Sequence, residues 1–178
     1  YGRKNRELRS ALARIEDLAI RDEQTGLHNR RYFQMMVERQ RAASARDGRP
    51  FVVAILDLDH FEAVRTSYGE RCAEKVLVEL GHLIAGMVRE IDLVARYGDG
   101  EFAVMLSGAA LKAGEQVLER IRQKVADGAF TIEQVRLTMS VGVVQYQPNE
   151  SGDVLIQRAD QLVAEAQRGG RNRVESRG

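Results

Sequence analysis

Two acidic residues in separate apolar segments could together hold a divalent cation. Asp57 follows the apolar run FVVAIL, and Glu101 precedes the apolar segment FAVML. Carboxylate oxygens are preferred ligands of Mg²⁺, which proteins hold on a nucleoside triphosphate with one or two carboxylates. We therefore predict a metal site at Asp57 and Glu101, provided that the two segments converge. The alternative is that both carboxylates are solvated surface groups at strand ends.

The stretch LVARYGDGEFAVML, residues 93–106, predicts a β-hairpin whose tip could hold a phosphate. Apolar arms flank the tip Gly98-Asp99-Gly100-Glu101, and glycine there permits a positive φ or a close backbone approach to a ligand. Asp99 is unfavourable for such a ligand, because its carboxylate would repel phosphate oxygens unless a cation intervened. In the alternative, Asp99 points to solvent and stabilises the turn.

The elements that would position these residues predict a mixed α/β (α+β) domain. A continuous apolar run at 51–56 is typical of a strand buried on both faces, and its period of two places Asp57 and Asp59 on the same face. Helical spacing of apolar residues follows the loop that begins at Arg21 and recurs at 70–90, 111–126 and 154–168, with a further strand at 135–146. This order predicts a mixed sheet with helices on its faces.

The first twenty residues predict a helix that is separate from the domain at 21–178. Its apolar residues repeat at 3-4-3 spacing among charged residues, which is typical of a coiled-coil seam. We expect this helix to join two copies of the chain into a homodimer; packing of the helix against its own domain is the alternative. The predicted seam consists of Leu8, Ala11, Ile15 and Leu18.

Composition excludes several classes of function. The 178 residues are 44% hydrophobic and carry a net charge of +1, so we expect a globular core and no contact with nucleic acid. No apolar run reaches the roughly 20 residues that span a bilayer, and we expect no membrane contact within the chain. The single cysteine, Cys72, excludes an internal disulfide and is typical of a reducing compartment.

Six motifs in one order resemble the GGDEF domain of bacterial diguanylate cyclases, which condense two GTP molecules into cyclic di-GMP. The resemblance runs from about residue 20 to residue 174. It implies a nucleotidyl-cyclase-like palm that dimerises through an upstream signalling helix. It also implies Mg²⁺ as the cofactor when GTP is bound. The expected location is the cytoplasm, where the domain could form the cytosolic part of a larger sensor protein. The motifs are DEQTGLHNRRYF, LDLDHF, YGERCAEKVL, RYGDGEF, LTMSVGV and ADQLVAEAQRGGRNRV.

The hairpin tip departs from the family pattern Gly-Gly-Asp/Glu-Glu-Phe. Aligned without a gap, Asp99 replaces the second glycine and Gly100 replaces the first acidic residue. The family assigns that acidic position to metal binding or to activation of the 3′-hydroxyl nucleophile, and Gly100 can do neither. A carboxylate one residue earlier, at Asp99, would point elsewhere.

The residues aligned with the family's guanine and phosphate contacts also differ. Arg65 and Glu74 stand where Asn and Asp read the base. Glu74 could still accept from guanine N1 and N2, whereas Arg65 has only donors and could address only guanine O6 and N7. In the alternative, Arg65 and Glu74 pair with each other as surface charges. Two lysines of the family pattern are replaced by Glu62 and Gln167, whereas Arg171 is retained. We expect GTP to bind weakly or not at all.

One ligand motif is intact. Arg89-Glu90-Ile91-Asp92 matches the family's inhibitory pattern Arg-x-x-Asp, which binds cyclic di-GMP. An arginine can contact guanine N7 and O6 or a phosphate, and an aspartate can accept from guanine N1 and N2. The resemblance implies a cyclic di-GMP site at Arg89 and Asp92, with Arg120 as a supporting contact; a helix end followed by a turn is the alternative.

The sequence therefore predicts a degenerate GGDEF signalling domain without cyclase activity. It would act as a cyclic di-GMP-binding or regulatory module and would need no cofactor. A first alternative is an active, weak diguanylate cyclase that uses Asp57, Asp99 and Glu101 with Mg²⁺. A second is a nucleotide-free platform for dimerisation or for a protein partner.

Overall fold

The computed structural model describes residues 2–128 and 135–178, except for the side chains of residues 17 and 18. The predicted mixed α/β fold is confirmed, and α3 and β5 are additional to the predicted order. The helices are α1 (Gly2–Ile20), α2 (Arg30–Asp47), α3 (Phe61–Tyr68), α4 (Glu70–Gly86), α5 (Leu111–Ala126) and α6 (Gly152–Arg168). The strands are β1 (Phe51–Leu58), β2 (Leu93–Gly98), β3 (Glu101–Ser107), β4 (Met139–Gln145) and β5 (Arg173–Arg177).

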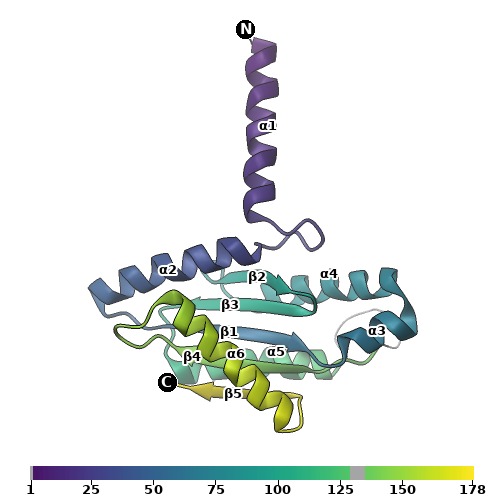
Figure 1. Cartoon of the computed structure of the whole chain (residues 1–178), viewed down its shortest axis with the longest axis vertical. Helices are drawn as coiled ribbons and strands as arrows, with labels where there is room; N and C mark the ends of the chain where they lie inside the picture. The colour runs from purple at the N-terminus through teal and green to yellow at the C-terminus, as the bar shows by residue number, and fades with distance from the viewer. Residues whose placement is uncertain (1, 129–134) are drawn as a thin grey trace.

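The strands form one mixed sheet in the order β2-β3-β1-β4-β5. Only the β4–β5 pair among these neighbours is parallel. β1 is the central strand, and its apolar residues alternate between two cores: Val52, Ala54 and Leu56 pack toward α4 and α5, whereas Val53 and Ile55 pack toward α2 and α6. Helices therefore cover both faces of the sheet (Figure 1), as the uninterrupted apolar run at 51–56 predicts.

Hydrogen bonds to the Asp59 carboxylate connect the end of β1 to neighbouring segments. Its side chain is buried, and its carboxylate accepts hydrogen bonds from Thr138 Oγ1 at 2.6 Å, from Ser140 Oγ at 2.7 Å and from the backbone N–H of Asn172 at 3.0 Å. A buried carboxylate needs such donors to offset its desolvation. Asp59 is thus a structural residue that positions the neighbouring Asp57.

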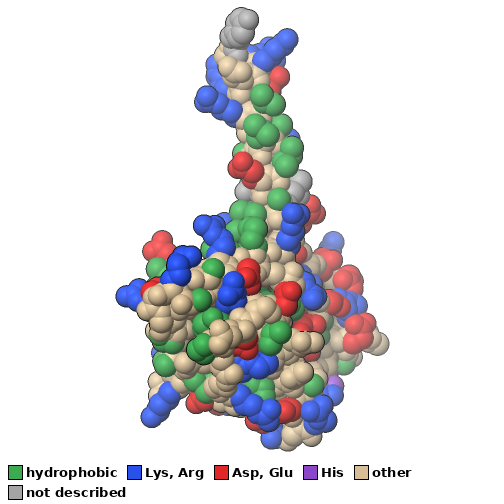
Figure 2. All heavy atoms as spheres, turned by 60° about the vertical axis from the view of Figure 1, so that its left-hand side comes forward, with side chains coloured by type: hydrophobic (Ala, Val, Ile, Leu, Met, Phe, Trp, Pro, Cys, Tyr) green, Lys and Arg blue, Asp and Glu red, His purple; other side chains and the backbone are tan. Residues whose placement is uncertain are grey.

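Helix α1 projects away from the rest of the domain as a stalk (Figure 1). Leu8 and Ile15 of the predicted seam are 59% and 62% exposed, and Leu12, which that seam omits, is 49% exposed. Apolar side chains accordingly lie open along the stalk in Figure 2. The alternative that this helix packs on its own domain is wrong for these residues, while the side chain of Leu18 lies outside the described residues. No helix in the described part of the chain is long and apolar enough to span a membrane.

Candidate functional site

The structure brings Asp57 and Glu101 together. They are register partners in the antiparallel β1–β3 pair. Burial raises the pKa of Asp57 to about 6; the hydrogen bond from Gln167 opposes this shift, and the charge of Asp59 adds to it. Burial, and then the charge of Asp57, also raises the pKa of Glu101. Two crowded, half-buried carboxylates are suitable donors for a divalent cation, since a cation would relieve their repulsion.

Two charged residues that the sequence interpretation missed lie close to this pair. Asp160 on α6 contributes to the raised pKa of both Asp57 and Glu101, and Arg30 at the start of α2 acts in the opposite direction on Glu101. The Arg30 guanidinium also lies 4.3 Å from the ring centroid of Tyr97. Across residues 2–128 and 135–178, no group of three or more His, Cys, Asp or Glu side chains has a metal-binding arrangement. A cation here would depend on Asp57 and Glu101.

The hairpin tip needs glycine at position 100. Gly100 has a φ of +73°, and its carbonyl accepts from Leu58 N–H at 2.9 Å. A Cβ added there would lie 3.0 Å from Phe61 Cδ1 and 3.2 Å from Phe61 Cβ. The tip therefore packs directly on the start of α3, at the position where the family has an acidic side chain.

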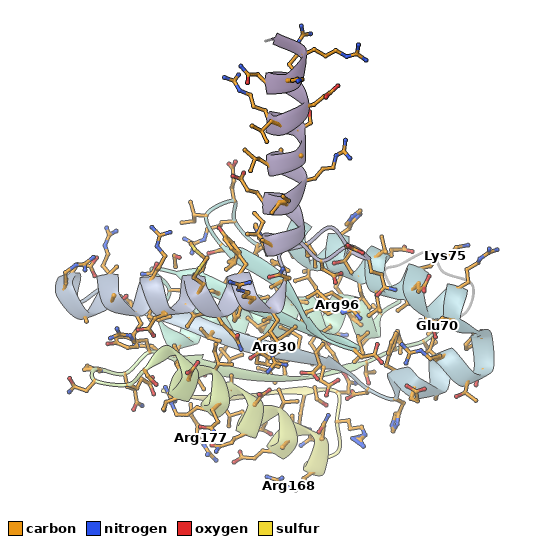
Figure 3. All side chains as sticks on the ribbon, turned by 45° about the horizontal axis from the view of Figure 1, so that its top comes forward. Arg30, Glu70, Lys75, Arg96, Arg168 and Arg177 are labelled. Atoms are coloured by element: carbon orange, nitrogen blue, oxygen red, sulfur yellow. The ribbon has the colours of Figure 1, made fainter. Side chains whose placement is uncertain are left out.

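Asp99 pairs with Arg65 of α3 and does not simply face solvent. Two parallel hydrogen bonds of 2.9 Å join the guanidinium to both carboxylate oxygens, and the hydrogen bond from Arg65 lowers the pKa of Asp99. Arg65 also binds Glu62 at 2.7 Å and Glu70 at 2.6 Å; Glu70 lies at the start of α4 in Figure 3. The alternative pairing of Arg65 with Glu74 is therefore wrong, and Glu74 lies exposed on α4.

Arg96 connects the tip to the segment that follows the stalk. Its guanidinium donates to Gly98 O at 2.7 Å and to Gln24 Oε1 at 2.6 Å, and it lies 3.6 Å from carboxylate oxygens of both Asp22 and Asp99. Figure 3 shows Arg96 in the region below α1. The position of an arginine within an apolar arm of the hairpin is the sequence signal that could have identified Arg96 as a contact of the tip.

The C-terminal motif also reaches the carboxylates. Gln167, in place of the family lysine, donates through Nε2 to Asp57 Oδ2 at 3.0 Å. Arg171 has a φ of +66° and its charge lowers the pKa of Asp57, although burial outweighs it. The amide of Gln167 carries no positive charge, so it offsets the negative charge of Asp57 less than the family's lysine would.

Arg89 and Asp92 lie together in the turn between α4 and β2. Asp92 has a side chain only 1% exposed, and its carboxylate accepts from Arg89 N at 2.8 Å, Arg89 Nε at 3.1 Å and Arg89 Nη2 at 3.0 Å. Arg89 Nη2 also donates to Ser107 O at 2.6 Å. Both residues line a pocket of about 470 Å³ that also includes Arg120 and Met87.

Comparisons with known proteins identify the family of the chain. Residues 19–173 match the family described as "Diguanylate cyclase, GGDEF domain". The chain is 36% identical over 159 residues to diguanylate cyclase DgcP of Pseudomonas aeruginosa. The aligned region covers 88% of this chain but only 24% of DgcP. The chain thus spans about a quarter of that relative.

Solved structures show the same fold over nearly the whole chain. The coiled coil and GGDEF domain of DgcB from Caulobacter crescentus, in complex with cyclic di-GMP, has a TM-score of 0.91 at 28% identity and covers 99% of this chain and 95% of its own. Diguanylate cyclase SiaD of Pseudomonas aeruginosa, in complex with its activator SiaC, has a TM-score of 0.84 at 31% identity and covers 99% of this chain and 68% of its own. The chain belongs to the GGDEF domain family of diguanylate cyclases.

Proposed function

We propose that this chain is a GGDEF module that does not synthesise cyclic di-GMP and that binds it as a regulatory ligand at Arg89, Asp92 and Arg120. The observation that carries the proposal is the hairpin tip. Gly100 packs on Phe61, and the neighbouring carboxylate, Asp99, is bound by Arg65. No second carboxylate of the tip is therefore available beside Glu101.

This arrangement weakens catalysis through charge and geometry. Asp57 and Glu101 would hold Mg²⁺ with GTP, and the cation would supply charge stabilisation to the transferring phosphoryl group. Gly100 provides no acidic group to position the cation or to take a proton from the 3′-hydroxyl. Gln167 provides no ammonium for the phosphates. Preorganised charge usually makes the largest contribution to such a reaction, so the loss of both groups supports an inactive module.

The pocket at Arg89 supports the receptor role. The Arg89 side chain is 57% exposed, so a ligand can reach it without unfolding the turn. Arg89 and Arg120 supply two cationic groups on one pocket of about 470 Å³, whose wall also includes apolar Val117. Cationic donors beside apolar surface suit a phosphate-linked purine ligand. The relative DgcB was solved in complex with cyclic di-GMP.

Dimerisation through α1 is part of the proposal. Leu8, Leu12 and Ile15 are all exposed on the stalk, and a second copy would remove these apolar side chains from water. The DgcB structure contains a coiled coil with its GGDEF domain. A protein partner is the second candidate for this regulatory module, since the relative SiaD was solved with its activator SiaC.

Two measurements on one protein preparation test the proposal. Incubation with GTP and Mg²⁺ or Mn²⁺ should give no cyclic di-GMP by chromatography, and clear multiple turnover would instead support the weak cyclase. Calorimetry should show cyclic di-GMP binding that Arg89→Ala weakens by roughly thirty-fold or more, because charge-assisted contacts are lost. Arg71→Ala, at an exposed arginine on α4, should bind like the wild type. Equal binding by all three proteins would refute the receptor role.

A further inference from the structure

We infer that the Arg65–Asp99 ion pair is a latch that holds the hairpin tip on α3 and keeps guanine nucleotides out of the site at Asp57 and Glu101. The inference rests on the proposed function and gives a structural reason for the expected weak binding of GTP. It starts from one juxtaposition: two positions that depart from the family pattern, 34 residues apart in sequence, bind each other.

The donors of Arg65 are nearly all in use. Nε donates to Glu70 at 2.6 Å, Nη1 donates to Glu62 at 2.7 Å and to Asp99 at 2.9 Å, and Nη2 donates to Asp99 at 2.9 Å. A guanidinium has five N–H groups, so these four bonds leave a single one on Nη2. Arg65 therefore cannot present a pair of donors to a guanine edge unless it releases Asp99 or an acidic partner.

The latch is reinforced from both sides. The Arg65 guanidinium lies 5.1 Å from the ring centroid of Phe61, and Phe61 is the residue that a Cβ at Gly100 would meet. On the other side, Arg96 lies 3.6 Å from Asp99 Oδ1. The Arg65 side chain is 24% exposed and that of Asp99 is 58% exposed, so water screens the charges of the pair in part, and the two parallel hydrogen bonds fix its geometry. The tip and α3 are therefore held together by charge and by ring packing.

The charge of the cluster adds a barrier to a triphosphate. Arg65 and Arg96 contribute two positive charges, whereas Glu62, Glu70 and Asp99 contribute three negative charges, which leaves a balance of −1. Like charges repel an approaching triphosphate. Removing Arg65 alone would make this balance worse, because Asp99 would stay at the tip without its main counter-ion. Opening the latch for a nucleotide requires both residues to change.

The test is a double-variant titration with a non-hydrolysable GTP analogue and MgCl₂. The double variant Arg65→Asn with Asp99→Gly should bind at least roughly ten-fold more tightly than the wild type. Arg65→Asn alone should show no gain, since Asp99 then stays at the tip without its main counter-ion. Arg71→Asn, at an exposed arginine on α4, is the matched control and should bind like the wild type. Equal affinity of the wild type and the double variant would overturn the latch.

A second measurement applies even if the double variant folds poorly. Amide hydrogen exchange at residues 98–101 should be faster in Arg65→Asn than in Arg71→Asn, because the tip loses its contact with α3. Equal exchange in these two proteins would overturn the latch. Cyclic di-GMP titration of the same variants separates the two proposals. If none binds cyclic di-GMP but the double variant gains the GTP analogue, the receptor role fails and the latch stands.

Discussion

Asp57 lies opposite Glu101 across the antiparallel β1–β3 pair, and its charge adds to burial in raising the pKa of Glu101. The fold therefore keeps two carboxylates in a position that is unfavourable without a cation. Gln167 donates one hydrogen bond to Asp57, which stabilises the ionised carboxylate but adds no positive charge to the pair.

Asp57→Asn should stabilise the protein at pH 7.5. The Asp57 pKa rises from 3.8 to about 6, so the folded state retains a proton that the unfolded state releases between about pH 4 and 6. Stability therefore falls as pH rises through this window, and the full penalty, on the order of 2 to 3 kcal/mol, is present above about pH 6. Asparagine removes the charge and keeps an acceptor for Gln167.

Thermal or urea unfolding of both proteins at several pH values checks this expectation. The advantage of Asp57→Asn should be largest at pH 7.5 and should shrink toward zero near pH 4. A stability difference that does not change with pH would rule out the titration of Asp57 as its cause.

Gly100→Ala should destabilise the protein more than Gly26→Ala. The φ values are nearly the same, +73° and +74°, so both variants carry the strain of a left-handed backbone, about 1 kcal/mol. The new Cβ at position 26 has no neighbour within 4 Å, whereas the new Cβ at position 100 lies 3.2 Å from the Cβ of Phe61. Rotation of the Phe61 ring does not move its Cβ and therefore cannot relieve this contact. An additional loss of about 1 to 2 kcal/mol is expected in urea unfolding.

If Gly100→Ala and Gly26→Ala lower the free energy of unfolding equally, Phe61 moves aside without cost. Restoring the family tip with Asp99→Gly and Gly100→Asp would place a Cβ at a positive φ and 3.0 Å from Phe61 Cδ1, so that Phe61 must move by a few tenths of an ångström, and Arg65 and Gln167 would remain. We therefore expect this double variant to show no cyclase activity, as checked by chromatography of the product.

The sequence predicted the elements with strong periodic patterns and the pairing that follows from them. The apolar run before Asp57 and the hairpin that carries Glu101 indicated a metal site only if the two segments converged, and the register of β1 with β3 meets that condition. By contrast, β5 has the sequence RVESR, which lacks apolar alternation and pairs with β4 through tertiary context. α3 was missed because it is only eight residues long and begins after His60, a non-glycine residue with a φ of 56°.

The Arg65–Asp99 contact could not be predicted from spacing. It depends on how the hairpin tip sits against α3, which is set by the close approach of Gly100 to Phe61. From the sequence alone, each residue had a simpler interpretation: Asp99 as a solvated turn residue, and Arg65 as a partner of Glu74. Long-range charge pairs require the three-dimensional register of both elements.

The stalk should support concentration-dependent dimerisation. Leu8→Glu with Ile15→Glu should weaken it, because a charge in an apolar seam is desolvated without a partner. Ala13→Glu, at an exposed position on the opposite face of α1 from Leu8 and Ile15, is the control and should dimerise like the wild type. Light scattering over a range of concentrations measures the mass. A wild-type protein that stays monomeric throughout would exclude the seam.

Substitutions of Arg89 and of Asp92 should differ in their effects on stability and on cyclic di-GMP binding. Asp92 is buried and accepts from the backbone N–H groups of Arg89 at 2.8 Å and Ser107 at 3.3 Å, so it supports the turn as well as the pocket. Asp92→Ala leaves these donors without their acceptor and should lower the free energy of unfolding by about 1 to 3 kcal/mol. Arg89→Ala keeps the Asp92 contacts to backbone and should lose less stability, while weakening cyclic di-GMP binding strongly. If Asp92→Ala unfolds like the wild type but loses binding, Asp92 serves the ligand alone; if it unfolds early and still binds, the arginines carry recognition.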